Sequence, residues 1–274
     1  MERRTPSSGD DRPLSRSRGL LCDLDGTLYV GNSLIPGADE AVAYLRAAGL
    51  KLRFLTNTTT RSRRSLHAHL KSLGLAVEQD EILSAAYAGV LYLRSIGSPR
   101  CRLVLAEDPA ADYEEFRKDD ADPEAIVVGD IGERWSYDLL NSLFHQVAGG
   151  ARLVALHKNR YYETPNGLSL DIGAFVAAVE YAAGIEAATI GKPAAAFFDL
   201  ALDELGLPAE EVIIIGDDID NDVGAGQANG LTGILVRTGK FRGNFAAVSH
   251  VKPMFTVDSV SSLPQLLEKF RNRT

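Results

Sequence analysis

Short apolar runs alternate with helix-like stretches along most of the chain. Residues 19–22 form an apolar run that predicts a buried strand, and residues 38–48 have the composition of a helix that ends at Gly49. The next strand is predicted at 50–55, and a basic amphipathic helix is predicted at 61–73. Strand, helix, strand and helix at this spacing indicate a parallel sheet with crossover helices.

The middle of the chain repeats this alternation with different side chains. The pattern predicts helices at 84–96, 110–118, 136–148 and 171–183, strands at 102–106, 125–128 and 152–156, and a polar loop at 157–167. These elements are enough for a separate α/β module with its own core. The module carries no dense acidic or nucleophilic motif.

The first pattern resumes near position 188. The predicted elements are a strand at 188–190, a helix at 194–205, a strand at 212–215, a helix reaching 229–230, a strand at 233–236 and a helix at 263–270. The fold class is therefore α/β, with a Rossmann-like parallel-sheet core at 18–82 and 189–274. The second module is inserted into it at 83–188.

Four predicted strands of the core end in polar residues that suit a phosphate or a cation. These residues are Asp23 and Asp25, Thr56 and Asn57, Lys192, and Asp217. In an open parallel sheet, ligands bind at the carboxyl ends of the strands. The groups can therefore converge, although they are spread over much of the sequence.

The stretch 23–27, with the sequence DLDGT, carries the densest chemistry. Asp23 and Asp25 are two positions apart, so both carboxylates lean to the same side of an extended backbone. Gly26 allows a sharp turn, and the Thr27 hydroxyl can bond back to the loop. Close carboxylates repel each other, so the arrangement suits a hard cation, a shared proton, or both.

The order of these motifs resembles a known family. DLDGT, then a strand followed by Thr-Asn, then Gly-Lys-Pro, then Gly-Asp-x-x-x-x-Asp resemble the four motifs of the haloacid dehalogenase-like hydrolase superfamily. Asp25, the second acid of the first motif, resembles the phosphatases of that superfamily rather than its dehalogenases. The inserted module is similar to the large α/β cap domain of the branch that includes nucleotide monophosphatases and pyridoxal phosphate phosphatases.

A closer resemblance, to phosphatases of phosphoamino acids and inorganic pyrophosphate, lies in the stretches 157–162, 167–171, 180–181, 216–218 and 238–242. The resemblance implies a Mg²⁺-dependent phosphatase that hydrolyses phosphate esters, phosphoramidates or pyrophosphate through an aspartyl-phosphate. Asp23 would attack phosphorus, and Asp25 would move protons. Mg²⁺ would be held by Asp23, Asp217 and the backbone carbonyl of Asp25.

The remaining site residues are also implied by the resemblance. Lys192 would neutralise charge on the transferring group, while the Thr56 hydroxyl and the Asn57 backbone N–H would hold phosphate oxygens. Asp222 and Thr27 are expected to support the site from behind. Asn159 is the candidate substrate contact in the cap, because the loop 157–167 resembles the substrate-specificity region of the family.

The composition and charge of the chain exclude some classes of binding partner. The 274 residues, with 29 basic and 37 acidic side chains and a net charge of -8, argue against a general nucleic-acid binder and a basic membrane-surface protein. No apolar stretch approaches the length that is needed to span a membrane. We therefore expect a small phosphorylated substrate or pyrophosphate, no nucleic acid and no membrane, and the resemblance suggests a possible homodimer through the cap.

Cys22 and Cys101 form no metal or redox pattern, which favours a cytoplasmic setting. Residues 1–17 are expected to be a disordered tail.

A nucleotide, sugar-phosphate or pyridoxal phosphate phosphatase of the same superfamily stays open, and so does a non-catalytic phospho-accepting or partner-binding domain. An EF-hand loop from Asp218 is excluded, because Val223 and Asn229 stand where that loop needs Gly and Glu. A receiver domain is disfavoured, since it would be about half this length and would not need Asp25.

Overall fold

The computed structural model describes residues 12–164 and 167–271. The chain divides into two compact units. The first consists of Met1–Thr56, His67–Leu83 and Lys192–Thr274, and the second of Asn57–Leu66 and Ser84–Gly191. The expected domain boundaries, 18–82 with 189–274 and 83–188, stay predictions.

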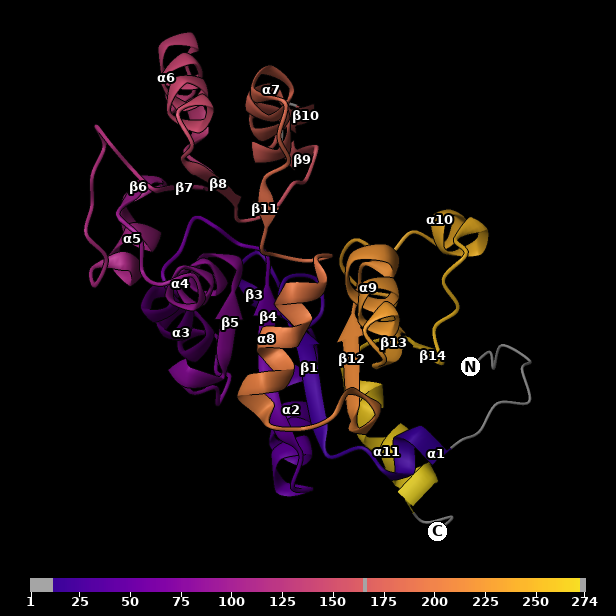
Figure 1. The fold of residues 1–274 in the computed structure, drawn as a ribbon. Helices are drawn as coiled ribbons and strands as arrows, with labels where there is room; N and C mark the ends of the chain where they lie inside the picture. The colour runs from indigo at the N-terminus through magenta and orange to yellow at the C-terminus, as the bar shows by residue number, and fades with distance from the viewer. Residues whose placement is uncertain (1–11, 165–166, 272–274) are drawn as a thin grey trace. The chain divides into compact units, whose positions relative to one another are not determined.

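The first unit is built on a six-stranded sheet whose strand order is β14-β13-β12-β1-β4-β5 (Figure 1). The strands are β1 (Gly19–Asp23), β4 (Lys51–Thr56), β5 (Ile82–Ser84), β12 (Val212–Gly216), β13 (Thr232–Val236) and β14 (Phe255–Val257). β1 pairs in parallel with both β12 and β4, and all five of its residues are buried. A parallel strand buried on both faces needs a continuous apolar run, which the sequence supplies.

Helices and short turns surround this sheet. They are α1 (Arg12–Ser15), α2 (Ala38–Ala47), α3 (Arg63–Ser72), α8 (Ala195–Leu205), α9 (Ala225–Ala228), α10 (Gly243–Val248) and α11 (Leu263–Arg271). A small antiparallel hairpin, β2 (Tyr29–Val30) with β3 (Ser33–Leu34), follows β1. Gly206 ends α8 in the left-handed region, with φ of 62°, where a side chain would be strained.

The second unit has its own four-stranded sheet, ordered β11-β8-β7-β6 (Figure 1). Its strands are β6 (Cys101–Val104), β7 (Ala125–Val128), β8 (Arg152–Ala155) and β11 (Ala188–Thr189). Its helices are α4 (Ala85–Ser95), α5 (Glu107–Ala110), α6 (Tyr137–Ala148) and α7 (Ile172–Ala183), and β9 (Tyr161–Thr164) pairs with β10 (Gly167–Leu170) as a hairpin. All pairings within the four-stranded sheet are parallel.

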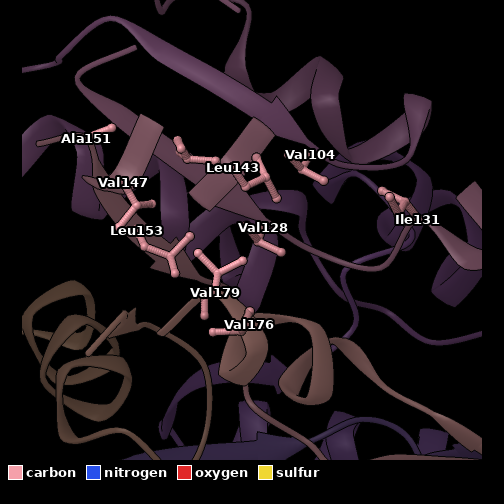
Figure 2. Packing of buried hydrophobic residues seen from close by; sticks show 11 residues of the cluster. Val104, Val128, Ile131, Leu143, Val147, Ala151, Leu153, Val176 and Val179 are labelled. Atoms are coloured by element: carbon pink, nitrogen blue, oxygen red, sulfur yellow. The ribbon is translucent and has the colours of Figure 1, made fainter. Parts of the chain in front are cut away.

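A separate hydrophobic core supports the second unit (Figure 2). Val128 of β7 and Leu153 of β8 lie in one buried cluster with Leu143 of α6 and with Val176 and Val179 of α7. Burying side chains of this size contributes about 1.5–3 kcal/mol each. The unit therefore has the core that its alternating pattern predicted, and the fold class, a parallel-sheet α/β core with a further α/β unit, is confirmed.

Several predicted elements are wrong in detail. The expected helix 110–118 is replaced by α5 and a 3-10 turn at Ala111–Tyr113, since the Tyr113 side chain turns inward and donates to the Ala86 carbonyl at 2.6 Å. Part of the expected polar loop 157–167 is strand β9, because it pairs with β10 across the hairpin. Short strands β5 and β14 and the β2–β3 hairpin were not predicted, since a run of two or three residues carries too little periodicity.

The expected disordered tail, 1–17, lies only partly within the described residues. Residues 1–11 lie outside the described residues, whereas Arg12–Ser15 form α1. Leu14 is fully buried, and α1 packs against α11 in the first unit. One apolar side chain is enough to order this short stretch when another helix offers it a partner.

Candidate active site

The register of the central strands brings the predicted acidic and hydroxyl residues to one edge of the sheet. Asp23 ends β1 and lies opposite Leu55 of β4, so Thr56 is one residue further along the neighbouring strand. Cys22 lies opposite Ile215 of β12, so Asp217 follows that strand at the same level. Parallel strands therefore place Asp23, Thr56 and Asp217 together, as the motif order predicted.

Lys192 joins this group, although the strand before it, β11, pairs with β8 in the sheet of the second unit and is not the core strand that was expected. Its Nζ atom donates to Oδ1 of Asp23 at 2.5 Å and to Oδ1 of Asp222 at 2.6 Å. The side chains of Lys192, Asp23 and Asp222 are only 4%, 7% and 2% exposed. A buried ammonium needs such partners, because an unpaired charge away from water costs several kcal/mol.

Hydrogen bonds hold Asp23 and Asp222 on the side away from Lys192 as well. The Thr27 hydroxyl donates to Oδ2 of Asp23 at 3.1 Å, so both oxygens of Asp23 are held. Oδ2 of Asp222 accepts from the backbone N–H of Asp218 at 3.2 Å. Asp218 in turn caps the π-helical turn Ile219–Gly224 by accepting from the N–H groups of Asp220 and Asn221. This turn fixes Asp222 behind Lys192.

A second loop, 238–240, holds the site and was not predicted from the sequence as part of it. The backbone N–H of Lys240 donates to Oδ2 of Asp217 at 2.5 Å, and the Thr238 hydroxyl donates to the Gly26 carbonyl at 2.5 Å. Gly26 and Gly239 have φ of +88° and +57°, and a Cβ on either would lie 2.0 Å from Oδ2 of Asp217. The sequence signal was the glycine at 239, which has to be glycine because Asp217 leaves no room for a side chain.

The electrostatics of the site are dominated by excess negative charge. Burial, together with the charge of Asp23, raises the pKa of Asp217 to about 7. Burial and the charge of Asp23 also raise the pKa of Asp222 to about 6, against the opposing effect of Lys192. Burial alone would lower the pKa of Lys192, but the charges of Asp222 and Asp23 outweigh it and raise that pKa above its ordinary value.

The acidic cluster has the composition of a site for a hard divalent cation. Asp23, Asp217 and Asp222 are buried, and one carboxylate oxygen from each lies within 4.8 Å of the others. Three carboxylates and the single Lys192 ammonium sum to a formal charge of two negatives. Carboxylate oxygens are the preferred ligands of Mg²⁺, so the donor set fits such an ion.

Three predicted residues are not part of this buried cluster. The Asp25 side chain is exposed, in the turn that follows β1. Asn57 belongs to the second unit, where a Cβ on Gly191 would lie 2.7 Å from its Oδ1 atom. Asn159 also belongs to that unit, and its carbonyl accepts from the Gly173 N–H at 3.0 Å. Their roles at the site stay predictions.

Comparison with known proteins identifies relatives of this chain. The family model described as haloacid dehalogenase-like hydrolase matches residues 20–118, and the one described as HAD-hydrolase-like matches residues 189–263. The phospholysine phosphohistidine inorganic pyrophosphate phosphatase of Bos taurus is 39% identical over 260 residues, which cover 93% of this chain and 95% of that protein. The haloacid dehalogenase-like hydrolase domain-containing protein 2 of Homo sapiens is 38% identical and covers 88% of this chain and 92% of its own.

A solved structure shows the same architecture. The p-nitrophenyl phosphatase from Archaeoglobus fulgidus superposes with a TM-score of 0.85 at 29% identity, covering 91% of this chain and 99% of that one. The fold, the site and these relatives together define a phosphohydrolase. The chain belongs to the haloacid dehalogenase-like hydrolase family.

The expected absence of a membrane segment can be checked only within the described residues. None of the helices described there is both long enough and apolar enough to cross a bilayer.

Proposed function

We propose that this phosphohydrolase depends on Mg²⁺ and works through an aspartyl-phosphate formed on Asp23. The observation that carries the proposal is the buried cluster of Asp23, Asp217 and Asp222 with Lys192 as its single buried cation. So much buried negative charge is expensive unless a cation shares the site. Phosphoryl transfer requires the same cation, because a carboxylate facing a phosphate dianion is repelled.

The fixed geometry of Asp23 suits a nucleophile. Lys192 and Thr27 hold its two oxygens in place at the end of β1. One carboxylate oxygen would form a bond to phosphorus while the bond to the leaving oxygen breaks, which divides a slow hydrolysis into two faster steps. Water would then attack the phosphorus of the aspartyl-phosphate, releasing inorganic phosphate and restoring Asp23.

Asp25 suits the proton transfers of both steps. Its side chain is exposed, two residues beyond the buried Asp23. It would give a proton to the leaving oxygen in the first step and take one from the attacking water in the second. A carboxyl group that reaches solvent can exchange protons between the two steps, whereas Asp23 is too buried for that task.

Mg²⁺ would be held by Asp23, Asp217 and the Asp25 backbone carbonyl, and would supply positive charge to the transferring phosphoryl group. Lys192, which contacts Oδ1 of Asp23, would neutralise charge on the same group. The Thr56 hydroxyl and the Asn57 N–H would hold phosphate oxygens, and Asp222 and Thr27 would keep Lys192 and Asp23 oriented.

The relatives suggest which substrates to try. We infer phosphate esters, phosphoramidates or inorganic pyrophosphate, with a nucleotide, sugar phosphate or pyridoxal phosphate as the alternative within the family. Asn159 would contact the substrate from the second unit, which would act as the cap, and a homodimer through that unit is part of the proposal. A cytoplasmic setting fits the two buried free cysteines, Cys22 and Cys101.

The proposal is tested by measuring phosphate release with Mg²⁺ from pyrophosphate, phosphohistidine, phospholysine, sugar phosphates and nucleotides. Asp23→Asn should lower turnover of every accepted substrate at least about a thousandfold, since it removes the nucleophile. Asp203→Asn, at an exposed position of α8, is the matched control and should act like wild type. Retained turnover in Asp23→Asn would contradict the mechanism, and a monomer in light scattering would contradict the dimer.

A further inference from the structure

The side chain of Lys240 has no role in the mechanism above, although its backbone does. Its N–H holds Asp217, and the turn that carries it is closed by the Phe241 N–H, which donates to the Thr238 carbonyl at 3.1 Å. The Arg242 guanidinium braces the same turn by donating to the carbonyls of Gly239 and Phe241. Lys240 is therefore anchored firmly beside the acidic cluster while its side chain is exposed.

The positive charge of the Lys240 side chain is not neutralised by an ion pair. Among the residues that the structure describes, no carboxylate lies within ion-pairing distance of its ammonium group. The residue nevertheless lies against the acidic cluster, because its backbone N–H donates to Oδ2 of Asp217.

The other basic side chains near this edge of the first unit are already engaged or lie elsewhere. The segments 24–37 and 217–224 contain no Lys or Arg. Arg237 pairs with Asp258 at 2.7 Å, and Lys192 is buried between Asp23 and Asp222. Lys240 and Arg242 are thus the described basic residues of these loops that form no ion pair with a carboxylate, and the Arg242 guanidinium is held against the carbonyls of Gly239 and Phe241 while the Lys240 ammonium is not.

A substrate with two phosphoryl groups needs a second cation at the entrance of such a site. The first group would sit at Asp23 and Lys192, but the second would meet the exposed Asp25 and the half-buried Asp218. The negative charge of these carboxylates would repel it unless a cation intervenes, and an ammonium on a flexible stem is a suitable point charge for a phosphate.

We propose that the Lys240 ammonium binds a second anionic group of the substrate, so that the site prefers diphosphates to monophosphate esters whose other half is uncharged. This inference rests on the phosphohydrolase function proposed above and names its substrate class. It assigns Lys240 to substrate recognition and leaves the attack on phosphorus to Asp23.

Binding can be measured without turnover. We would titrate the protein calorimetrically, in Mg²⁺, with methylenediphosphonate and with methylphosphonate, neither of which can be hydrolysed. Lys240→Ala keeps the backbone N–H on Asp217 and should weaken diphosphonate binding about tenfold, the usual value of one charge-assisted contact, while methylphosphonate weakens by no more than about threefold. Lys240→Arg should recover most of the diphosphonate affinity.

Kinetics provide the second measurement. Lys240→Ala should raise KM for pyrophosphate about tenfold and lower kcat/KM for p-nitrophenyl phosphate by no more than about threefold. Lys71→Ala is the matched control, because Lys71 is an exposed lysine in the last turn of α3. That crossover helix follows β4, so its last turn lies towards the opposite edge of the sheet.

The inference is overturned if Lys240→Ala weakens both phosphonates equally or neither of them. It is also overturned if the wild-type protein binds the diphosphonate no more tightly than methylphosphonate. A wild-type protein with a Lys240-dependent preference for the diphosphonate, but without phosphate release from any substrate, would leave this inference standing and reject the proposed function. The two claims can therefore fail separately.

Discussion

The Nζ atom of Lys192 donates to Oδ1 of Asp23 at 2.5 Å, across 169 positions of sequence. The same nitrogen donates to Asp222, so one ammonium links the candidate nucleophile to the carboxylate behind it. A positive charge in this place offsets the repulsion between the buried carboxylates of Asp23 and Asp222 and holds the Asp23 side chain in position. In the proposed function the pair would therefore serve both the stability of the fold and the reaction.

Replacement of Lys192 should separate those two effects. Lys192→Met leaves Asp23 and Asp222 facing each other without their counter-charge, so we expect a loss of about 3–5 kcal/mol of unfolding free energy at neutral pH. Turnover should fall at least about a hundredfold, as when one charge-stabilising donor is removed from an active site. Urea unfolding and phosphate release measure the two quantities.

The double variant Lys192→Met/Asp222→Asn is the control for this experiment. It removes one of the two carboxylates that the lysine had neutralised, so part of the lost stability should return. Turnover should stay low, because the ammonium is still missing. Recovery of turnover in the double variant would show that Lys192 acts only on folding.

The stability of the metal-free protein should depend on pH, because two of its buried aspartates have raised pKa values. The pKa of Asp217 is raised to about 7 and that of Asp222 to about 6, both above the ordinary aspartate value of 3.8. Between about pH 4 and 7 the native state therefore binds more protons than the unfolded state, and its stability falls as pH rises. One pKa unit corresponds to about 1.4 kcal/mol, but the two acids share the same repulsion, so we expect a total loss on the order of 2 kcal/mol.

Thermal unfolding in a chelator, from pH 5 to pH 8, measures this loss. The melting temperature of the wild-type protein should decrease over the range, whereas Asp217→Asn should give a flatter profile because the group with the higher pKa is gone. Asp203→Asn keeps the cluster intact and should follow wild type. A wild-type melting temperature that rises over this range would contradict the assignment.

The framework of the site was predictable because it depends on strand ends. Apolar runs gave β1, β4 and β12, and parallel strands leave Asp23, Thr56 and Asp217 at one edge whatever their loops do. Membership of Lys192 followed from motif order, and its contacts agree. These features survive local errors in element boundaries, because a strand carries its last residue to the same place.

The features that could not be predicted depend on close contacts in three dimensions. The Lys240 N–H bonded to Asp217 is a backbone group, which no side-chain pattern marks. The Asp218 side chain caps the turn that aims Asp222, although a charge in an acidic loop looks like an ordinary solvated residue. The β9–β10 hairpin was missed because Tyr161 and Tyr162 are set among polar residues, where alternation is weak.

Cation binding should stabilise the folded protein as well as activate it. Because Mg²⁺ bound as proposed would relieve the repulsion among Asp23, Asp217 and Asp222, saturation at about a hundredfold over Kd should add about 2.7 kcal/mol to the unfolding free energy. For a protein of this size this corresponds to a rise in melting temperature of about 5 °C or more. Thermal melts with and without Mg²⁺, and phosphate release after exhaustive chelation, test the claim together.

The variant Asp217→Asn localises this effect. It removes a charged ligand and should abolish most of the thermal shift, while Asp203→Asn should keep it. Full activity after chelation would show that the cluster holds no required cation. An unchanged thermal shift in Asp217→Asn would place the cation elsewhere.

A pair of glycine variants can test how tightly the turn at 238–240 fits against Asp217. Gly239 and Gly31 have nearly the same positive φ, +57° and +61°, so alanine at either position should cost about 1–2 kcal/mol from backbone strain alone. A Cβ at Gly31 meets nothing within 4 Å, whereas a Cβ at Gly239 would lie 2.0 Å from Oδ2 of Asp217. Gly239→Ala must therefore displace either the Lys240 N–H or the Asp217 carboxylate.

We expect Gly239→Ala to cost clearly more unfolding free energy than Gly31→Ala and to weaken Mg²⁺ binding about tenfold or more, since a displaced ligand loses its geometry. Urea unfolding and calorimetric Mg²⁺ titration of the two variants measure these differences, and equal effects in both would show that the turn does not position Asp217.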